Sequence, residues 1–142
     1  MKKIILQPYV RKANFYETDQ MGIIHHSNYI RWFEEARVDF MSQIGYGYEK
    51  SIELGVDFAI TGVTCDYKSM TRFGDSVVIH SNIVMMTHSR MTVEYQVRDS
   101  VTNDLRVIGE TRHCFLDTDK KRPVSLKKLL PDLYKLFEST MQ

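Results

Sequence analysis

The segment of residues 16–37 combines a carboxylate pair, a glycine and the start of a helix, which together permit chemistry on a carbonyl group. Glu17 and Asp19 follow an extended stretch, Gly22 lies in the loop beyond them, and a helical pattern begins at Ser27. A helix N-terminus presents unpaired N–H groups that can stabilise an oxyanion. A nearby carboxylate can attack a carbonyl carbon or activate water, and a glycine lets the backbone approach a ligand.

The same residues have a simpler explanation, because acidic residues also precede helices where they merely suit the helix dipole. His25 and His26 follow Gly22 and are candidates for ligands or bases, but ordinary loop residues are favoured from the residues alone. The five histidines and the two cysteines, Cys65 and Cys114, show no spacing typical of a metal site. We therefore expect no metal, no cofactor and two buried free thiols, which suits a reducing cytoplasm.

The period of the apolar residues predicts the elements that position this segment. From Tyr29 to Ile44 they recur at three- and four-residue steps, which is helical spacing. Ser27 or Asn28 is expected to cap this helix and Gly45 to end it. After residue 56 the period becomes two, and turn residues separate four stretches rich in β-branched and aromatic residues. We expect strands over 56–69, 75–87, 90–99 and 104–117.

Shorter segments complete the pattern. Residues 9–16 look extended, and residues 48–54 are expected to form a short helix. A C-terminal helix is expected from Ser125, with Pro131 in its first turn or splitting it. Short breaks between strands imply antiparallel hairpins, and the apolar stripe of the long helix needs a sheet face to cover it. The order of elements predicts an α+β domain in which a sheet wraps a helix.

Composition limits the classes to which the protein can belong. Its 142 residues suit one domain over 1–142, and 43% hydrophobic with 26% charged residues are typical of a soluble globular protein. The net charge of +1 lacks the basic excess of nucleic-acid binders. The apolar run of residues 4–6 is too short for a signal peptide, and no stretch approaches the roughly 18 apolar residues of a membrane span. We expect a cytoplasmic protein without a nucleic-acid partner.

A longer motif surrounds the candidate carboxylates. It consists of Glu17-Thr18-Asp19, Gly22, Ile23-Ile24, His25-His26, Asn28-Tyr29 and Glu34-Glu35-Ala36-Arg37. This motif resembles the signature of the 4-hydroxybenzoyl-CoA thioesterase family of hotdog-fold acyl-CoA thioesterases, and it is most similar to the branch with the Tol–Pal-associated thioesterase. Phe73-Gly74-Asp75 at a hairpin and the order of strands extend the resemblance over most of the chain, more weakly after residue 118.

The resemblance implies a hotdog fold, in which a five-stranded antiparallel sheet wraps a long central helix. It implies a homodimer or homotetramer with the active site at a subunit interface. The expected reaction is hydrolysis of an acyl-CoA, or of an acyl carrier protein thioester, to the free acid and the thiol. Asp19 matches the catalytic aspartate, as nucleophile or general base. Backbone N–H groups from Gly22 to His26, above all that of His26, would polarise the thioester carbonyl.

The same resemblance suggests residues for substrate binding. His25, Asn28 and Tyr29 are expected to shape the site, and Arg90 corresponds to a region that contacts CoA. Other cations that could hold the CoA phosphates are Lys68 and Arg72.

Two acidic residues of the motif receive no catalytic role. Glu17 departs from the aspartate that is usual at its position. Glu34 lies three residues before Arg37, so the two are expected to pair on one helical turn.

Two alternative functions are open. Dehydratases and hydratases of acyl thioesters share the fold and pair a histidine with a carboxylate of the central helix, for which His25 or His26 with Glu34 is conceivable. A non-catalytic hotdog module that binds acyl-CoA is the second alternative. The acyl chain is undetermined, since aromatic, short aliphatic and long fatty acyl groups are all used in the family.

Overall fold

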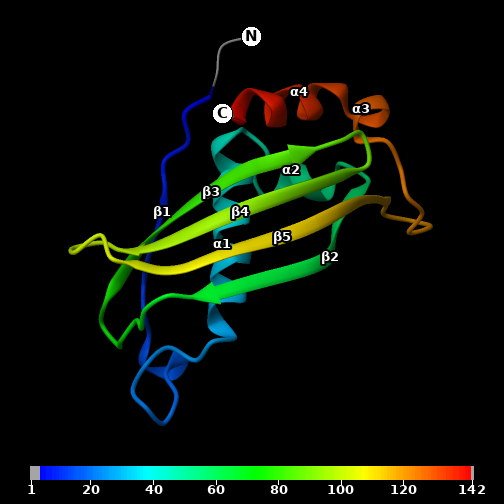
Figure 1. Ribbon diagram of the computed structural model, residues 1–142. Helices are drawn as coiled ribbons and strands as arrows, with labels where there is room; N and C mark the ends of the chain where they lie inside the picture. Colours follow the sequence, from blue (N-terminus) through cyan, green and yellow to red (C-terminus); the bar gives the residue numbers. More distant parts are fainter. Residues whose placement is uncertain (1–3, 142) are drawn as a thin grey trace.

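Five strands form one antiparallel sheet in the computed structural model, which describes residues 4–141 except for the side chains of Tyr48 and Ser51. The strand order is β1-β3-β4-β5-β2 (Figure 1). The strands are β1 (Tyr9–Lys12), β2 (Val56–Tyr67), β3 (Ser76–Met86), β4 (Arg90–Asp99) and β5 (Leu105–Asp117). The last four agree with the expected ranges to within two residues. Residues 1–3 and Gln142, the ends of the expected domain, lie outside the described part.

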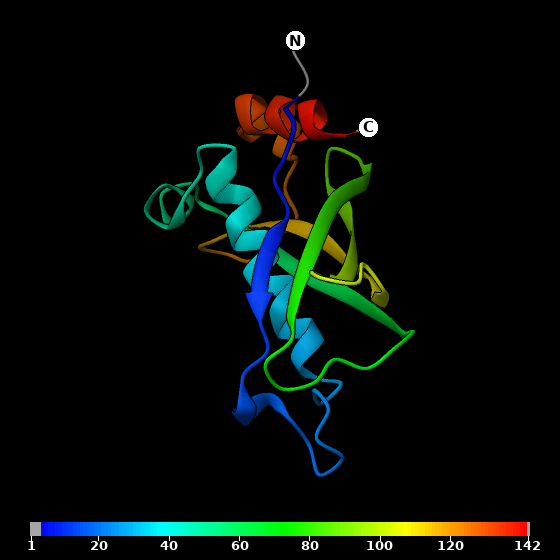
Figure 2. The same cartoon turned by 90° about the vertical axis from the view of Figure 1, so that its left-hand side faces the viewer.

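The long helix α1 (Asn28–Gln43) lies against the inner face of the curled sheet (Figures 1 and 2). Its buried side chains recur at the spacing seen in the sequence and include Trp32, Phe33 and Phe40. The Phe33 ring stacks on Tyr95 of β4, with 4.3 Å between centroids. The helical period therefore identified the face that covers the sheet, as expected of a helix that buries one apolar stripe.

The two ends of α1 differ in how the backbone is capped. Ser27 precedes the helix, but its side chain makes no capping hydrogen bond. Gly45 follows the last turn with a φ of 91°, a left-handed conformation that favours glycine and ends helices. The short helix α2 (Tyr48–Ile52) then leads into β2, as expected.

The expectation of an extended segment over residues 9–16 is wrong beyond Lys12. β1 pairs with β3 for four residues only, from Tyr9 opposite Ile79 to Lys12 opposite Ser76. A 3-10 turn, η1 (Phe15–Glu17), follows, because the Glu17 carboxylate accepts the backbone N–H of Asn14 at 2.9 Å.

The expected ion pair between Glu34 and Arg37 is also wrong. Arg37 instead donates to the Tyr95 hydroxyl at 3.1 Å. Within residues 4–141 no carboxylate oxygen lies within 4.0 Å of the Arg37 guanidinium. The ion pair made by α1 uses the neighbouring Glu35, with Arg11.

The C-terminal segment covers one end of the sheet. Pro131 divides it into α3 (Leu126–Leu129) and α4 (Pro131–Thr140), and Pro131 occupies the first turn of the second helix. The backbone N–H of Ile4 donates to the Ser139 carbonyl at 2.9 Å, so the N-terminal segment lies beside α4 (Figure 1). No helix within residues 4–141 is long and apolar enough to cross a membrane.

Both cysteines are free, but they are half-buried rather than fully buried. Burial raises the pKa of the Cys65 thiol. Cys65 is therefore a weak nucleophile at neutral pH.

Candidate active site

The loop that joins η1 to α1 folds back on itself as a small hairpin. Thr18 and Ile24 form an antiparallel bridge, and the Asp19 N–H donates to the Ile23 carbonyl at 2.9 Å. Gly22 turns the chain with a φ of 75° and donates its own N–H to the Asp19 carbonyl at 3.0 Å. This hairpin, residues 18–27, is hereafter the site loop. Its hydrogen bonds hold Asp19 near the start of α1.

Asp19 is half-buried and only partly engaged by the protein. Its Oδ1 accepts the backbone N–H of Met21 at 2.8 Å. Its Oδ2 has no hydrogen-bond partner among residues 4–141. One carboxylate oxygen is thus positioned by the loop, while the other is free to meet a carbonyl carbon or a water molecule.

The backbone N–H groups of the site loop differ in whether they are used. Those of Gly22, Ile24 and His25 donate to the carbonyls of Asp19, Thr71 and Glu17. Those of Ile23 and His26 have no acceptor within the described part of the chain. An oxyanion needs a donor that is not already engaged. The His26 N–H meets this condition, whereas Gly22 serves through its backbone conformation rather than its N–H.

Glu17 anchors the site loop through its side chain and its carbonyl group. Its carboxylate is 4% exposed and accepts from Arg11 at 2.6 and 2.8 Å and from the Trp32 indole at 2.8 Å. Its carbonyl accepts the His25 N–H at 2.8 Å and the Asn28 side-chain amide at 2.9 Å. The carboxylate and the carbonyl of Glu17 are thus both engaged in hydrogen bonds within the protein. Asn28, expected at the substrate, uses its amide to hold the loop.

Arg11 extends this network to α1. It donates to Glu35 at 2.9 Å, and this hydrogen bond holds the pKa of the Glu35 carboxyl below its usual range. Tyr9 donates to the same carboxylate at 2.8 Å, and burial raises the pKa of Tyr9 to about 12. These hydrogen bonds join β1, η1 and α1 next to the site loop.

The two histidines of the loop are stacked, with 4.1 Å between ring centroids. His25 Nδ1 lies 2.8 Å from the Ser27 hydroxyl, which explains why Ser27 does not cap α1. The His26 carbonyl accepts from the Tyr67 hydroxyl at 3.0 Å. The structure thus brings His25 and His26 together at the helix start, with both backbones held in place.

Tyr67 was missed by the sequence analysis and fixes the site loop from the end of β2. Its signal was weak, since a tyrosine at the end of a strand is common. Burial raises its pKa to about 12, so it remains a hydrogen-bond donor at neutral pH. Tyr29, expected at the substrate, is buried and donates to Thr71 Oγ1 at 3.0 Å. It contacts the Tyr67 ring at 5.6 Å between centroids and thus supports the site from the core.

The expected cations lie in different places. Arg90 begins β4, and the β3–β4 turn next to it lies beside α3, at the end of the sheet opposite the site loop (Figure 1). Arg72 forms a backbone bridge with Ile23 and is exposed beside the loop. Lys68 pairs with Asp66 at 2.7 Å on the surface. Within one chain, Arg72 is therefore the candidate next to Asp19, and the structure does not bring Arg90 there.

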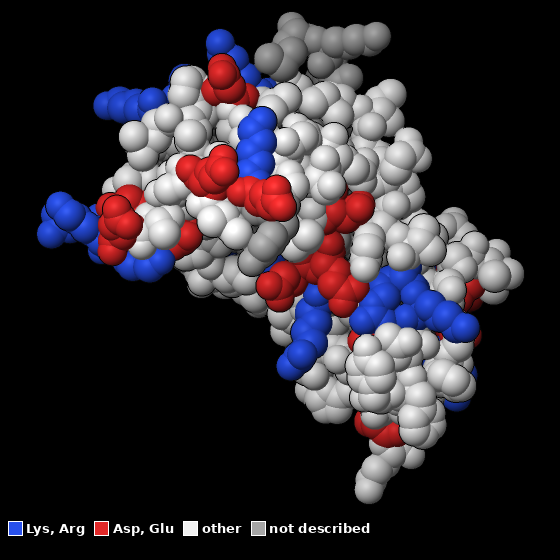
Figure 3. All heavy atoms as spheres, turned by 180° about the vertical axis from the view of Figure 1, so that it is seen from behind, with Lys and Arg blue, Asp and Glu red and all other residues white. Residues whose placement is uncertain are grey.

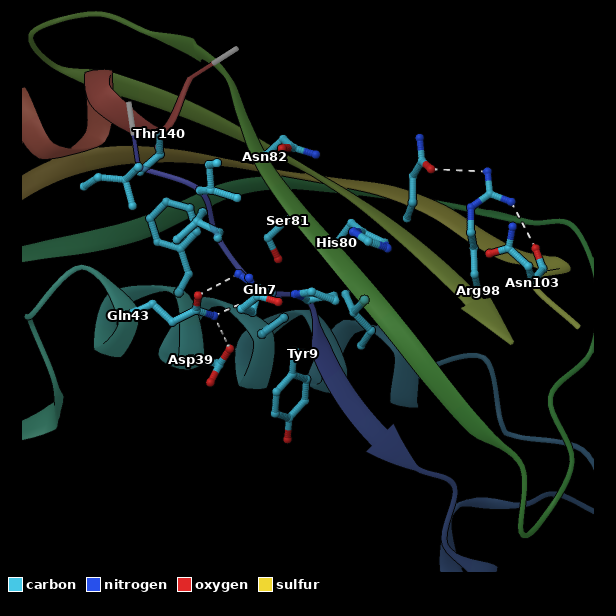
Figure 4. Close-up of a pocket in the computed structure, with 18 residues that line it drawn as sticks. Gln7, Tyr9, Asp39, Gln43, His80, Ser81, Asn82, Arg98, Asn103 and Thr140 are labelled. Carbon is cyan, nitrogen blue, oxygen red and sulfur yellow. Dashed lines mark hydrogen bonds between the residues drawn. The ribbon is translucent and has the colours of Figure 1, made fainter. Parts of the chain in front are cut away.

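A polar cavity of about 400 Å³ lies between residues 4–9, α1 and β3 (Figure 4). Gln43 spans part of it, exchanging hydrogen bonds with the Gln7 backbone at 2.8 and 2.9 Å and donating to Asp39 at 2.7 Å. None of the expected site residues lines this cavity. It is separate from the site loop, and several of its polar groups already have partners.

Charge is mixed rather than concentrated on the face opposite the view of Figure 1. Acidic and basic side chains are interspersed there, and neither sign covers the whole face (Figure 3). Within residues 4–141 no group of three or more His, Cys, Asp or Glu side chains is arranged to hold a metal ion.

Comparison with known proteins identifies the family of the chain. A family model described as the thioesterase-like superfamily matches residues 13–135. A protein of Aquifex aeolicus named "Putative esterase" is 35% identical over 113 residues, which is 79% of this chain and 86% of that protein. The acyl-CoA thioester hydrolase YbgC of Escherichia coli O157:H7 is 23% identical over 117 residues, 82% of this chain and 87% of the relative.

A solved structure has the same architecture. The DHNA-CoA thioesterase of Staphylococcus aureus superposes with a TM-score of 0.87 at 26% identity, covering 93% of this chain and 88% of the other. The chain therefore belongs to the thioesterase-like superfamily and adopts its hotdog fold.

Proposed function

We propose that this protein hydrolyses an acyl-CoA thioester to a free acid and CoA, with Asp19 as the catalytic carboxylate. The observation that carries the proposal is the unused His26 N–H, on the same short loop as a carboxylate with one free oxygen. Relatives named as thioester hydrolases support the same reaction. An acyl carrier protein thioester is the other substrate with this reactive group.

In the proposed mechanism the thioester oxygen accepts the His26 N–H, which stabilises the negative charge that develops there. Asp19 either attacks the carbonyl carbon or takes a proton from an attacking water. In the first route the C–S bond breaks, CoA leaves as the thiolate, and water then cleaves the mixed anhydride. In the second route the tetrahedral intermediate expels the same thiolate, which takes up the proton that Asp19 removed from water. Both routes return Asp19 to its carboxylate form.

The other loop residues receive supporting roles in this proposal. Gly22 allows the turn that holds Asp19, and His25 and Asn28 connect the loop to the Glu17 carbonyl. Tyr29 braces the helix start through Tyr67. Specificity for the acyl group is therefore assigned to side chains beyond this loop.

We propose that the active molecule is a cytoplasmic homodimer or a homotetramer built from dimers. β2 is an edge of the sheet and is twelve residues long, whereas β1 has only four. A long unpaired edge is a natural surface for pairing with a second copy. Because Arg90 lies at the opposite end of its own sheet from the site loop, it can reach CoA only at the site of another subunit.

The decisive experiment measures thiol release from aromatic, short-chain and long-chain acyl-CoAs by the wild type, Asp19→Asn and Asp119→Asn. Asp119 is an exposed aspartate in the turn after β5 and serves as the matched control. We expect hydrolysis that falls by several powers of ten in Asp19→Asn and is unchanged in Asp119→Asn. Equal rates in all three proteins would refute the role of Asp19.

The same panel separates the alternatives and the possible acyl groups. Loss of enoyl-CoA absorbance without thiol release would indicate a hydratase, and tight CoA binding without turnover would indicate a binding module. The acyl-CoA that is hydrolysed fastest would identify the acyl group, which the resemblance leaves open among aromatic, short aliphatic and long fatty chains.

A further inference from the structure

A second cavity, of about 250 Å³, lies between the later turns of α1, the inner face of the sheet and α4. Most of its wall is apolar and includes Val38, Met41, Ile83, Met91, Val93 and Phe137. Its polar lining comes from Glu34, Arg37, Tyr46, Ser81 and His113. None of the residues of the site loop lines it. An apolar pocket with a few polar groups is the usual form of a small-molecule site.

His113 lines this cavity and has an unused polar atom. The residue is 2% exposed, and its Nδ1 makes no hydrogen bond. The Phe58 carbonyl is near enough to raise the pKa of His113, but its geometry does not meet that of a hydrogen bond with Nδ1. Burial and the Arg37 charge outweigh this effect and lower the pKa of His113 to about 4. The imidazole is therefore neutral at physiological pH, and one of its nitrogens carries a proton.

A chain of hydrogen bonds assigns that proton to Nδ1. Arg37 donates to the Tyr95 hydroxyl at 3.1 Å. The Tyr95 hydroxyl lies 2.8 Å from Thr111 Oγ1, and Thr111 Oγ1 lies 2.7 Å from His113 Nε2. Tyr95 is fully buried, and Thr111 offers the acceptor for its proton. We assign the Thr111 proton to the hydrogen bond with Nε2, which leaves the imidazole hydrogen on Nδ1. His113 thus carries a buried N–H donor without an acceptor, which is costly in a folded protein.

Arg37 also lacks a partner for part of its guanidinium group. Its guanidinium reaches the buried Tyr95 hydroxyl, yet within the described residues it has no carboxylate partner. Half-buried charges are normally paired, and a guanidinium carries five N–H donors. Two residues with unused N–H donors, Arg37 and His113, therefore line one cavity. Glu34 is the acidic residue among the lining side chains, but it is exposed, so water screens its charge.

We propose that this cavity binds a small carboxylic acid, whose carboxylate accepts from Arg37 and His113 and whose apolar body fills the space along Met41, Met91 and Phe137. Benzene occupies a protein cavity of about 150 Å³, so 250 Å³ has room for about ten non-hydrogen atoms. Octanoate has this size and chemistry. A carboxylate is favoured over a neutral oxygen because it satisfies both donors and supplies the missing counter-charge.

The cavity contains methionines that report directly on its contents. In wild-type protein with ¹³C-labelled methionine methyls, octanoate is expected to shift the signals of Met41 and Met91, which line the cavity. Met21 and Met70 are exposed outside it and serve as internal controls. Octan-1-ol, with the same chain and no charge, is expected to bind at least tenfold more weakly. Absence of shifts at millimolar octanoate, or equal binding of acid and alcohol, would overturn the proposal.

Two substitutions test the donors separately. Arg37→Met and His113→Leu are each expected to weaken octanoate at least tenfold and to leave octan-1-ol nearly unchanged. Arg31→Gln, an exposed arginine on the same helix and outside the cavity, is the matched control. Wild-type affinity for octanoate in Arg37→Met would refute the carboxylate assignment, even if His113→Leu fails to fold. The experiment contains no thioester, so its result is independent of the proposed hydrolase activity.

Discussion

The buried side chain of Glu17 connects three parts of the chain next to the site loop. Its carboxylate joins Arg11 of β1, the Asn14 backbone and Trp32 of α1, and its carbonyl holds His25. These contacts explain why the chain leaves its extended course after Lys12.

Glu17→Gln is expected to lower the free energy of unfolding by about 3 kcal/mol, because it removes the buried carboxylate that pairs with Arg11 and leaves this half-buried guanidinium with Glu35 alone. Urea denaturation of the two proteins measures the difference. Asp57→Asn removes an exposed pair with Lys121 and is expected to cost less than about 1 kcal/mol. Similar losses in the two variants would contradict the structural importance of Glu17.

His113 predicts a pH dependence of stability. Its pKa is about 4 in the folded protein, against 6.5 for an unperturbed histidine. Between these values the unfolded chain binds the proton and the folded chain does not, so stability falls as pH decreases from 6.5 to 4. The loss from this group is on the order of 3 kcal/mol.

The contribution of His113 is isolated by comparing urea midpoints of the wild type and His113→Leu at pH 7 and pH 4.5. Carboxylates titrate in both proteins, so the difference between the two pH dependences belongs to His113. We expect the variant to lose less stability on acidification. Parallel curves would show that the imidazole is not neutral and buried as described.

At the scale of elements, the contact between α1 and β5 depends on a glycine. A Cβ on Gly109 would lie 2.4 Å from the Phe33 ring and 3.0 Å from the Thr64 carbonyl oxygen. This close approach lets Phe33 lie on Tyr95 against the sheet. The position tolerates no side chain because the aromatic ring and the backbone occupy the space.

Gly109→Ala is expected to destabilise the protein by about 1–3 kcal/mol through overpacking. Gly62→Ala is the matched control on β2, since its Cβ would meet only the flexible, half-exposed Arg112 side chain. Thermal unfolding should show a clear loss for the first and a small one for the second. Phe33→Leu in the Gly109→Ala background should recover part of the loss, and failure to do so would contradict the assigned clash.

At the scale of the whole molecule, the prediction concerns the free edge of the sheet. Sedimentation equilibrium is expected to give at least twice the mass of one chain. Ile60→Lys places a charge on an exposed apolar position of β2 and should shift the protein toward the monomer, as charges on edge strands do. Val101→Lys, in the exposed β4–β5 turn, is the control. A monomer in the wild type would contradict the proposed dimer.

Periodicity and turn chemistry are local properties, so the sequence by itself determined the long helix, the four long strands and the loop with Asp19. The helix face that packs on the sheet followed from residues three and four apart. The resemblance to a thioesterase signature placed the chain in the correct superfamily, because its motif lies within one continuous segment.

Only the tertiary structure decided which donors are used and which are free. Glu17 and Thr71 accept from the N–H groups next to His26, Tyr67 donates to the His26 carbonyl from a distant strand, and the His26 N–H has no acceptor among the described residues. Arg37 forms its hydrogen bond with Tyr95, far along the chain, and not with the nearby Glu34. Such choices depend on the positions of groups dozens of residues apart, which neither spacing nor composition encodes.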